Sequence, residues 1–255
     1  MGLFDWFRGS AECPVSPETR EWIDWRWEWL ENEFGKERVR SAPLVLPRAQ
    51  FFPDAFHSTE ECAAKMFVRV CGYMDVDPAT VQLSFFEDRD PLAGNPSFGA
   101  YRHDGAAGLY HADGDAFHIH IEAANLLDPL SMVGTMAHEL GHVHLLGHGR
   151  VGRDEEDHEP LTDLLTVFLG LGMFTANSVV KEKSWTDGSY SGWSIGRQGY
   201  LTMPDYGYAF SRFALSRCED GSKWAGELRL DVRSAFKQAM RFHAKNGKPA
   251  AAPAD

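Results

Sequence analysis

The chain has 255 residues, of which 44% are hydrophobic and 13% aromatic, so it can bury a sizeable core as one domain or two closely packed lobes. Its formal net charge of −12 repels nucleic-acid phosphate and anionic membranes on average, so we expect no nucleic-acid partner and favour basic or neutral peptides. The four cysteines lack metal-ligand spacing, which predicts free thiols in a reducing compartment and hence a cytoplasmic location.

The first stretch, 1–15, is apolar and aromatic but too short for a membrane span or a signal peptide, so we expect a tail. Ser16 and Pro17 then form a helix start, and apolar residues recur at helical spacing up to Phe34, before Gly35. The next expected elements are an extended linker at 43–53, a helix from Ser58 to about Tyr73, and strands at Val81–Phe86, Gly99–Tyr101 and Gly108–Tyr110.

Residues 117–122 read Phe-His-Ile-His-Ile-Glu, an alternation that predicts a half-buried strand. Its phenylalanine and isoleucines should pack on the core, while His118, His120 and Glu122 face the other way. A second metal on His118 and His120 is less favoured than an exposed polar face, because two histidines on one strand are a common coincidence.

Residues 128–148 contain the motif His138-Glu-Leu-Gly-His142. Histidines four apart on a helix differ in direction by about 40°, so both rings can reach one ion. Glu139 lies about 100° round from His138, where it can accept a proton from a zinc-activated water without binding the metal itself. This is the arrangement of H-E-x-x-H zinc hydrolases.

Residues that favour the two ends of a helix flank this segment. Asp128 is a suitable N-cap with Pro129 in the favoured first position, and Gly147 and Gly149 can end the helix in left-handed conformations. The side opposite the two histidines is apolar and consists of Val133, Met136, Leu140 and Val143. One face should therefore belong to the core and the other to the site.

Two histidines make an incomplete site, because catalytic zinc usually takes three protein ligands. A second helix is predicted to begin near Glu159 and Pro160, with Asp163 one turn further on. Glu159 can bind the metal, and Asp163 can accept the other ring N–H of a ligand histidine.

This combination resembles the gluzincin metallopeptidases, which include thermolysin-like enzymes and compact intracellular relatives of the ImmA/IrrE type, often written H-E-L-G-H. The resemblance covers about residues 117 to 175. It implies that Glu159 is the third zinc ligand and that Asp163 supports a ligand histidine. It also implies that the strand before the active helix borders the cleft and pairs with substrate, which makes His118 and His120 candidate substrate-binding residues.

A competing ligand set uses His148, which falls where the metzincin pattern places its third histidine. In that pattern Met203 would supply the methionine-containing turn below the metal. That pattern needs a glycine where this chain has Leu145, and leucine resists positive φ. We therefore favour Glu159. We favour Asp163, Glu155 and Glu156 less as the third ligand. The alternative that the chain binds no metal is also less favoured.

The downstream region carries fewer signals. Residues 153–158 are an acidic connector, and 184–199, rich in glycine and aromatic residues, is expected to be a long loop of the kind that covers a cleft. Helices are expected at about Gly207–Leu215 and Trp224–Lys245, and a disordered tail at 247–255. Any one of three tyrosines could donate a hydrogen bond to a developing oxyanion, and the sequence does not choose among Tyr200, Tyr206 and Tyr208.

The resulting prediction is an α+β, zincin-like domain at 16–246. It would have a small mixed sheet, an active-site H-E-x-x-H helix, a following E-x-x-x-D helix, and further N- and C-terminal helices. Its predicted function is zinc-dependent hydrolysis of peptide bonds, with a peptide or protein as substrate, His138, His142 and Glu159 on the zinc, and Glu139 as general base. The competing prediction is a non-catalytic, zinc-containing regulatory or protein-binding module.

Overall fold

The computed structural model describes residues 12–87, 107–114, 116–178, 180–187, 190–197 and 200–247. The expected strand at Gly99–Tyr101 and most of both expected terminal tails lie outside these ranges. The principal elements are α1 (Pro17–Phe34), α2 (Lys36–Ser41), α3 (Glu60–Met74), β1 (Val81–Phe86), β2 (Gly108–Asp113), β3 (Ala116–Glu122), α4 (Pro129–His142), α5 (His158–Phe168), α6 (Gly172–Ser178), β4 (Val180–Asp187), β5 (Tyr190–Arg197), α7 (Met203–Ser216) and α8 (Leu230–Asn246). The mixed α+β class expected from the sequence is confirmed.

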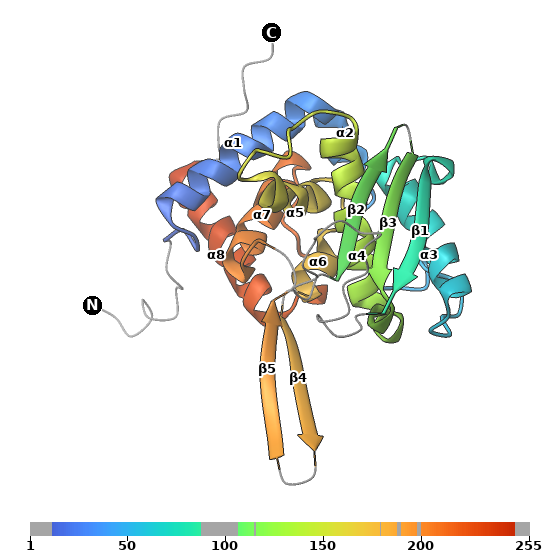
Figure 1. Cartoon of the computed structure of the whole chain (residues 1–255). Helices are drawn as coiled ribbons and strands as arrows, with labels where there is room; N and C mark the ends of the chain where they lie inside the picture. Colours follow the sequence, from blue (N-terminus) through green and yellow to red (C-terminus); the bar gives the residue numbers. More distant parts are fainter. Residues whose placement is uncertain are drawn as a thin grey trace.

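Strands β1, β2 and β3 form a small mixed sheet in the order β1-β3-β2. β3 is parallel to β1 and antiparallel to β2 (Figure 1). The predicted alternation of β3 is confirmed, because Phe117, Ile119 and Ile121 are buried while His118 and His120 are only partly buried. However, β3 is hydrogen-bonded to a strand on each side, so it has no free edge for the pairing with substrate that the resemblance implies. Alternation reveals which face is buried, but not the order of strands in the sheet.

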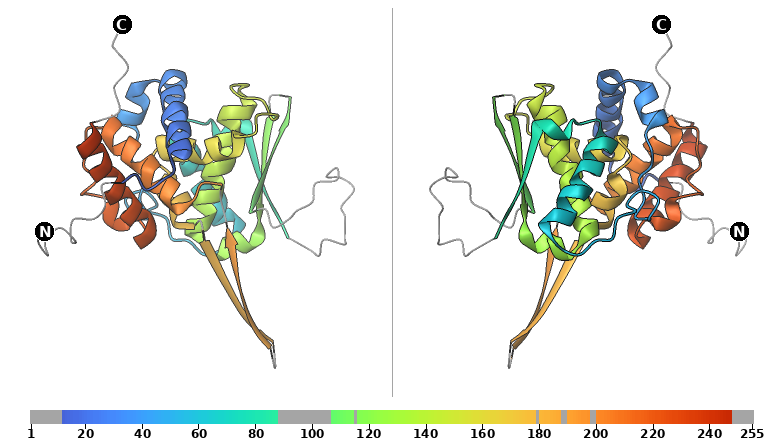
Figure 2. Two further views of the ribbon diagram at one scale, coloured as in Figure 1. Left: turned by 90° about the vertical axis from the view of Figure 1, so that its left-hand side faces the viewer. Right: turned by 90° about the vertical axis from the view of Figure 1, so that its right-hand side faces the viewer.

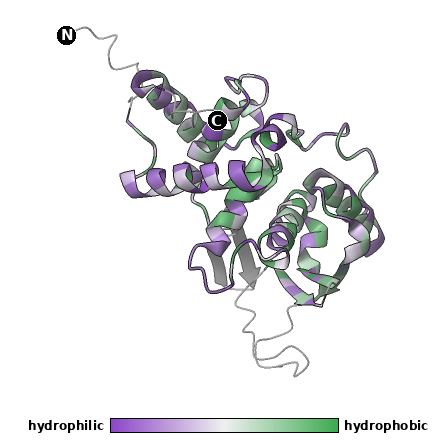
Figure 3. Cartoon of the chain, turned by 90° about the horizontal axis from the view of Figure 1, so that it is seen from above, coloured by the Kyte–Doolittle hydropathy of each residue, from purple (hydrophilic) through white to green (hydrophobic). Residues whose placement is uncertain are grey.

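Helices α4 and α5 lie in the middle of the molecule, between the sheet on one side and α1, α7 and α8 on the other (Figure 2). α4 packs on β2, β3, α3, α5 and α6, while α5 also packs on α1 and α7. The buried apolar side chains form one continuous cluster that extends from the sheet through α4 and α5 to α8. Figure 3 shows hydrophobic residues gathered in this interior and hydrophilic residues on the outer helices. The site-bearing helices are thus held from several directions.

The helix starts largely follow the expected capping chemistry. The Ser16 side chain accepts a hydrogen bond from Thr19 N at the start of α1, and Thr59 caps α3 in the same way. α7 begins at Met203, earlier than expected, because Thr202 and Asp205 form a capping box. α8 begins later than expected, after a 3₁₀ turn at Ala225–Glu227.

The expectation of a long loop at 184–199 is wrong. β4 and β5 pair in antiparallel register over their whole length, and the hairpin extends away from the helices (Figures 1 and 2). The glycines and serines in this stretch obscured the strand pattern, while backbone pairing overrides low local propensity. Within the described part of the chain, every helix is too short or too polar to span a membrane.

Candidate metal centre

The helix that carries the histidine pair begins as the sequence predicts. The Asp128 side chain accepts a hydrogen bond from Ser131 N at 3.1 Å, and Pro129 occupies the first turn, where a missing N–H costs little. All four residues of its predicted apolar side are buried, namely Val133, Met136, Leu140 and Val143. After His142 the backbone continues through a π-helical turn, Val143–Gly147, and Gly149 follows in the left-handed region. Because the apolar side of α4 is buried in the core, the two histidines on its other side face α5.

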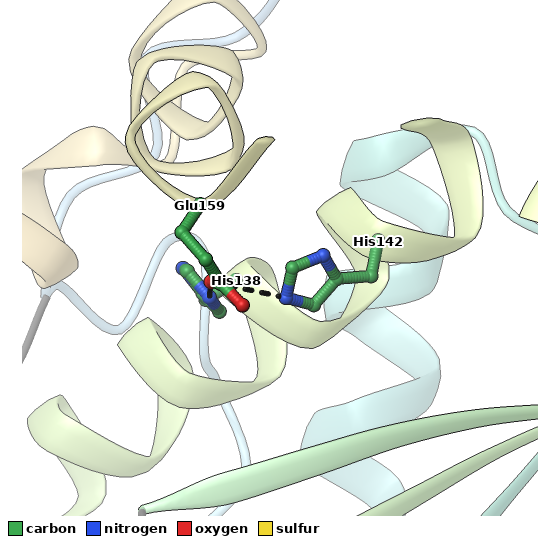
Figure 4. Close-up of side chains that lie close together, drawn as sticks. All are labelled: His138, His142 and Glu159. Atoms are coloured by element: carbon green, nitrogen blue, oxygen red, sulfur yellow. Dashed lines mark hydrogen bonds and ion pairs between the residues drawn. The ribbon is translucent and has the colours of Figure 1, made fainter. Parts of the chain in front are cut away.

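The structure brings the two histidines of α4 together with Glu159 of α5 (Figure 4). Glu159 Oε2 lies 3.1 Å from His138 Nε2 and 3.4 Å from His142 Nε2. Across the described ranges, these three residues are the one group of histidine, cysteine and acidic side chains whose ligand atoms all lie within 4.8 Å of one another. Two imidazole nitrogens and one carboxylate oxygen suit a catalytic zinc ion, which takes three protein ligands and leaves a position open.

Asp163 fixes the orientation of His138. Its Oδ1 lies 2.9 Å from His138 Nδ1, so the ring donates its Nδ1–H to the carboxylate and directs Nε2 at Glu159. Its Oδ2 accepts hydrogen bonds from the backbone N–H groups of Tyr200, at 2.6 Å, and Leu201, at 3.1 Å. One buried carboxylate thus holds both a candidate ligand and the segment that leads into α7.

Thr162 orients His142, a role that the sequence did not indicate. The Thr162 hydroxyl donates its only proton to the carbonyl oxygen of His158 at 2.7 Å, so its oxygen can accept the Nδ1–H of His142 at 3.3 Å. With Nδ1 held by Thr162, Nε2 is the ring atom of His142 that faces Glu159 and the one that would bind a metal ion. Thr162 therefore orients the ring of His142, as Asp163 orients the ring of His138.

A glycine in the motif allows α4 and α5 to approach closely. A Cβ atom at Gly141 would lie 2.7 Å from Thr162 Cγ2, closer than real Cβ contacts allow. Helix interiors ordinarily disfavour glycine. The absence of a side chain here is therefore explained by the close contact that places Glu159 and Thr162 against the histidines.

The electrostatics of the ligand group place a proton on His138 rather than on Glu159. Burial alone would lower the pKa of His138, but hydrogen bonds to Asp163 and Glu159 outweigh it and hold that pKa well above its usual value. Burial would raise the pKa of Glu159, but its hydrogen bonds to His138 and His142 bring that pKa well below its usual range. Burial lowers the pKa of His142. Glu159 is therefore ionised, and metal binding would displace a proton from His138.

Glu139 is almost fully buried beside the ligand group, with 5% of its surface exposed. Burial raises its pKa from 4.5 to about 7, although the neighbouring His138 acts in the opposite direction. Its carboxylate faces the backbone of β2, since a Cβ at Gly108 would lie 2.6 Å from Glu139 Oε1. A carboxylate with a pKa near neutrality can both accept and return a proton at physiological pH.

The structure distinguishes the three tyrosines. The Tyr200 ring stacks on His138, with ring centres 5.9 Å apart and planes 18° apart, and the residue is 55% exposed. Tyr206 and Tyr208 are buried in α7, where the Tyr208 hydroxyl is bonded to Asp24. Burial, together with nearby carboxylates including Glu159, raises the pKa of Tyr200 to about 12, so its hydroxyl stays protonated near neutral pH. Of the three, Tyr200 alone lies at the site.

Helix α1 fixes the start of α5 through its polar side chains. The buried Arg26 donates hydrogen bonds to both oxygens of Asp157, at 2.7 and 2.5 Å, and to Glu155 at 3.0 Å. Trp22 Nε1 also donates to Asp157 at 2.7 Å. Asp157 is the residue before α5, so these bonds position the first turn of α5, which carries Glu159. The sequence pattern of α1 indicated only apolar packing.

Some predicted residues lie elsewhere. His118 and His120, predicted to bind substrate, project from the face of the sheet opposite to the buried one, whereas α4 packs on the buried face, so the structure does not bring them to the ligand group. His148 Nδ1 is hydrogen-bonded to the Arg150 guanidinium at 3.0 Å and is not part of the ligand group. Glu155, a less favoured candidate ligand, is paired with Arg26. Met203 is the first residue of α7, and no turn forms there.

Comparison with protein-family models, with curated proteins and with solved structures finds no match to this chain.

Proposed function

We propose that this protein is a zinc-dependent peptide hydrolase of gluzincin type with a zincin-like fold. The observation that carries the proposal is the convergence of His138, His142 and Glu159, with the ionisable Glu139 beside them. The expected resemblance to gluzincins supports the same roles, since Asp163 bonds to a candidate ligand histidine as the resemblance implies.

Zinc, when bound, would supply Lewis-acid polarisation of the scissile carbonyl and would lower the pKa of water. His138, His142 and Glu159 would hold the ion. Glu139 accepts the proton released by the attacking water at its buried carboxylate and later passes it to the leaving amine nitrogen. Tyr200 donates a hydrogen bond from its hydroxyl to the developing oxyanion, an interaction that strengthens as negative charge accumulates.

β2 replaces β3 as the candidate strand for substrate pairing. It forms one side of the three-stranded sheet, and its backbone at Gly108 contacts Glu139 and Thr135 on α4. An extended peptide hydrogen-bonded along such a strand would present its backbone carbonyl groups near the general base.

The experiment that tests the proposal combines metal analysis of the purified protein with a peptide-library cleavage assay. We expect one zinc ion at the centre and cleavage that stops in Glu139→Gln, because the amide retains the shape of the side chain but cannot accept a proton. The variant should keep its zinc. Cleavage by Glu139→Gln would contradict the mechanism, while zinc without cleavage by the wild type would support the non-catalytic module instead.

A further inference from the structure

Three histidines from two neighbouring strands gather on the outer face of the sheet. His118 and His120 are two residues apart on β3, so both project from the same face. The strand register places His111 of β2 directly opposite His118. The sequence showed the first two as a pair, and only strand pairing adds the third.

The ring of His118 lies near the rings of both other histidines. The ring centres of His111 and His118 are 6.1 Å apart, and those of His118 and His120 are 6.4 Å apart. For comparison, the rings of His138 and His142 in the candidate zinc centre are 4.8 Å apart. His111 is exposed and the other two are partly buried, so rotation about side-chain torsions can close a gap of roughly 1.5 Å between ring centres.

A serine on the neighbouring strand orients one of the three rings. A neutral imidazole binds a metal ion through the ring nitrogen that carries no proton. Ser84 of β1 lies 2.6 Å from His120 Nδ1 and fixes the orientation of that ring, as partners of ligand histidines commonly do. The coordinating atom of His120 would then be Nε2.

This cluster is separate from the candidate zinc centre. The buried residues Phe117, Ile119 and Ile121 lie on the opposite face of the same strand, and α4 packs against that face. We propose that His111, His118 and His120 form a second site for a divalent transition-metal ion such as zinc. Three histidines from adjacent strands leave a coordination position open to solvent, which is the ligand set of a catalytic type of zinc site.

The test is the stoichiometry of zinc binding, measured by titrating the metal-free full-length protein in competition with a chromophoric chelator. We expect two equivalents in the wild type, one in His118→Ala, one in His142→Ala, and none in the double variant. The exposed His57 provides a matched control, so His57→Ala should bind as the wild type does.

Failure of this proposal and failure of the zinc hydrolase proposal give different results. If His118→Ala and His111→Ala both retain the wild-type stoichiometry, the second site does not exist, whatever His142→Ala shows. If His142→Ala retains it and His118→Ala loses one equivalent, the second site stands and the zinc centre fails. Should His118→Ala misfold, as judged by circular dichroism, His111→Ala at the exposed position decides the outcome alone.

Discussion

The two histidines of the candidate zinc centre are oriented by different partners. His138 donates to the buried carboxylate of Asp163, whereas His142 is held by the hydroxyl of Thr162. A carboxylate partner raises the basicity of a ligand ring more than a hydroxyl does, because it stabilises the positive charge that develops on coordination. We therefore expect Asp163 to contribute more to metal affinity than Thr162.

Substitutions at Glu159, Asp163 and His148 should have graded effects on zinc affinity. Glu159→Ala should weaken binding most, because it removes a ligand, and Asp163→Asn should weaken it by about 10- to 100-fold. His148→Ala should leave affinity nearly unchanged, since this ring bonds to Arg150 outside the ligand group. Competition with a chelator measures all three. If His148→Ala is the most damaging, the metzincin ligand set is correct.

Tyr200→Phe should reduce turnover while leaving the metal in place. The substitution retains the ring that stacks on His138 and removes only the hydroxyl. Loss of one oxyanion donor typically lowers kcat by about 10²- to 10³-fold. Steady-state kinetics on a peptide cleaved by the wild type, paired with zinc analysis of both proteins, provides the measurement. An unchanged kcat would exclude Tyr200 as the donor.

At the scale of elements, the site depends on the close approach of α4 and α5. Gly141→Ala places a methyl group 2.7 Å from Thr162 Cγ2, so the helices must separate or Thr162 must move. We expect weaker zinc binding and a loss of stability of about 1–3 kcal/mol, the usual cost of overpacking. Chemical unfolding and chelator competition measure the two effects.

Gly72 in α3 provides the matched control for Gly141. A Cβ at Gly72 would meet nothing within 4 Å, so Gly72→Ala should stabilise the protein by about 1 kcal/mol through helix propensity. Its zinc affinity should equal that of the wild type. If Gly141→Ala is also stabilising and binds zinc normally, the interhelical contact does not limit the site.

At the scale of the whole molecule, Glu139 links the site to stability against unfolding. Its pKa in the folded protein is about 7 and its ordinary value is 4.5, so between these values the folded state retains a proton that the unfolded state has lost. Protonated Glu139 makes its full contribution to the free energy of unfolding below pH 4.5. This contribution is lost as the pH rises to about 7 and the buried group ionises. The buried carboxyl group thus opposes folding at neutral pH.

We therefore expect the stability difference between metal-free wild type and Glu139→Gln to change with pH. Relative to the variant, the wild type should lose roughly 3 kcal/mol of unfolding free energy between about pH 4 and pH 8. Urea unfolding at several pH values in the presence of a chelator gives this difference, and groups common to both proteins largely cancel. Parallel pH profiles would show that the Glu139 carboxyl group is not perturbed by folding.

The sequence by itself determined the parts of the site that lie within single elements. The spacing of His138 and His142, the N-cap at Asp128 and the helix start around Glu159 are local patterns, because capping and helical periodicity act over only a few residues. The alternation of β3 likewise indicated its buried face. These expectations could be made from short stretches alone.

Only the tertiary structure decided which elements lie side by side. It placed β3 between two partners, brought Tyr200 and Thr162 to the histidines, paired β4 with β5, and set His111 opposite His118. Periodicity reports which side of an element is buried but carries no information about the neighbour that buries it. That choice depends on packing between residues far apart in the chain, where the burial of one shared core selects a single arrangement.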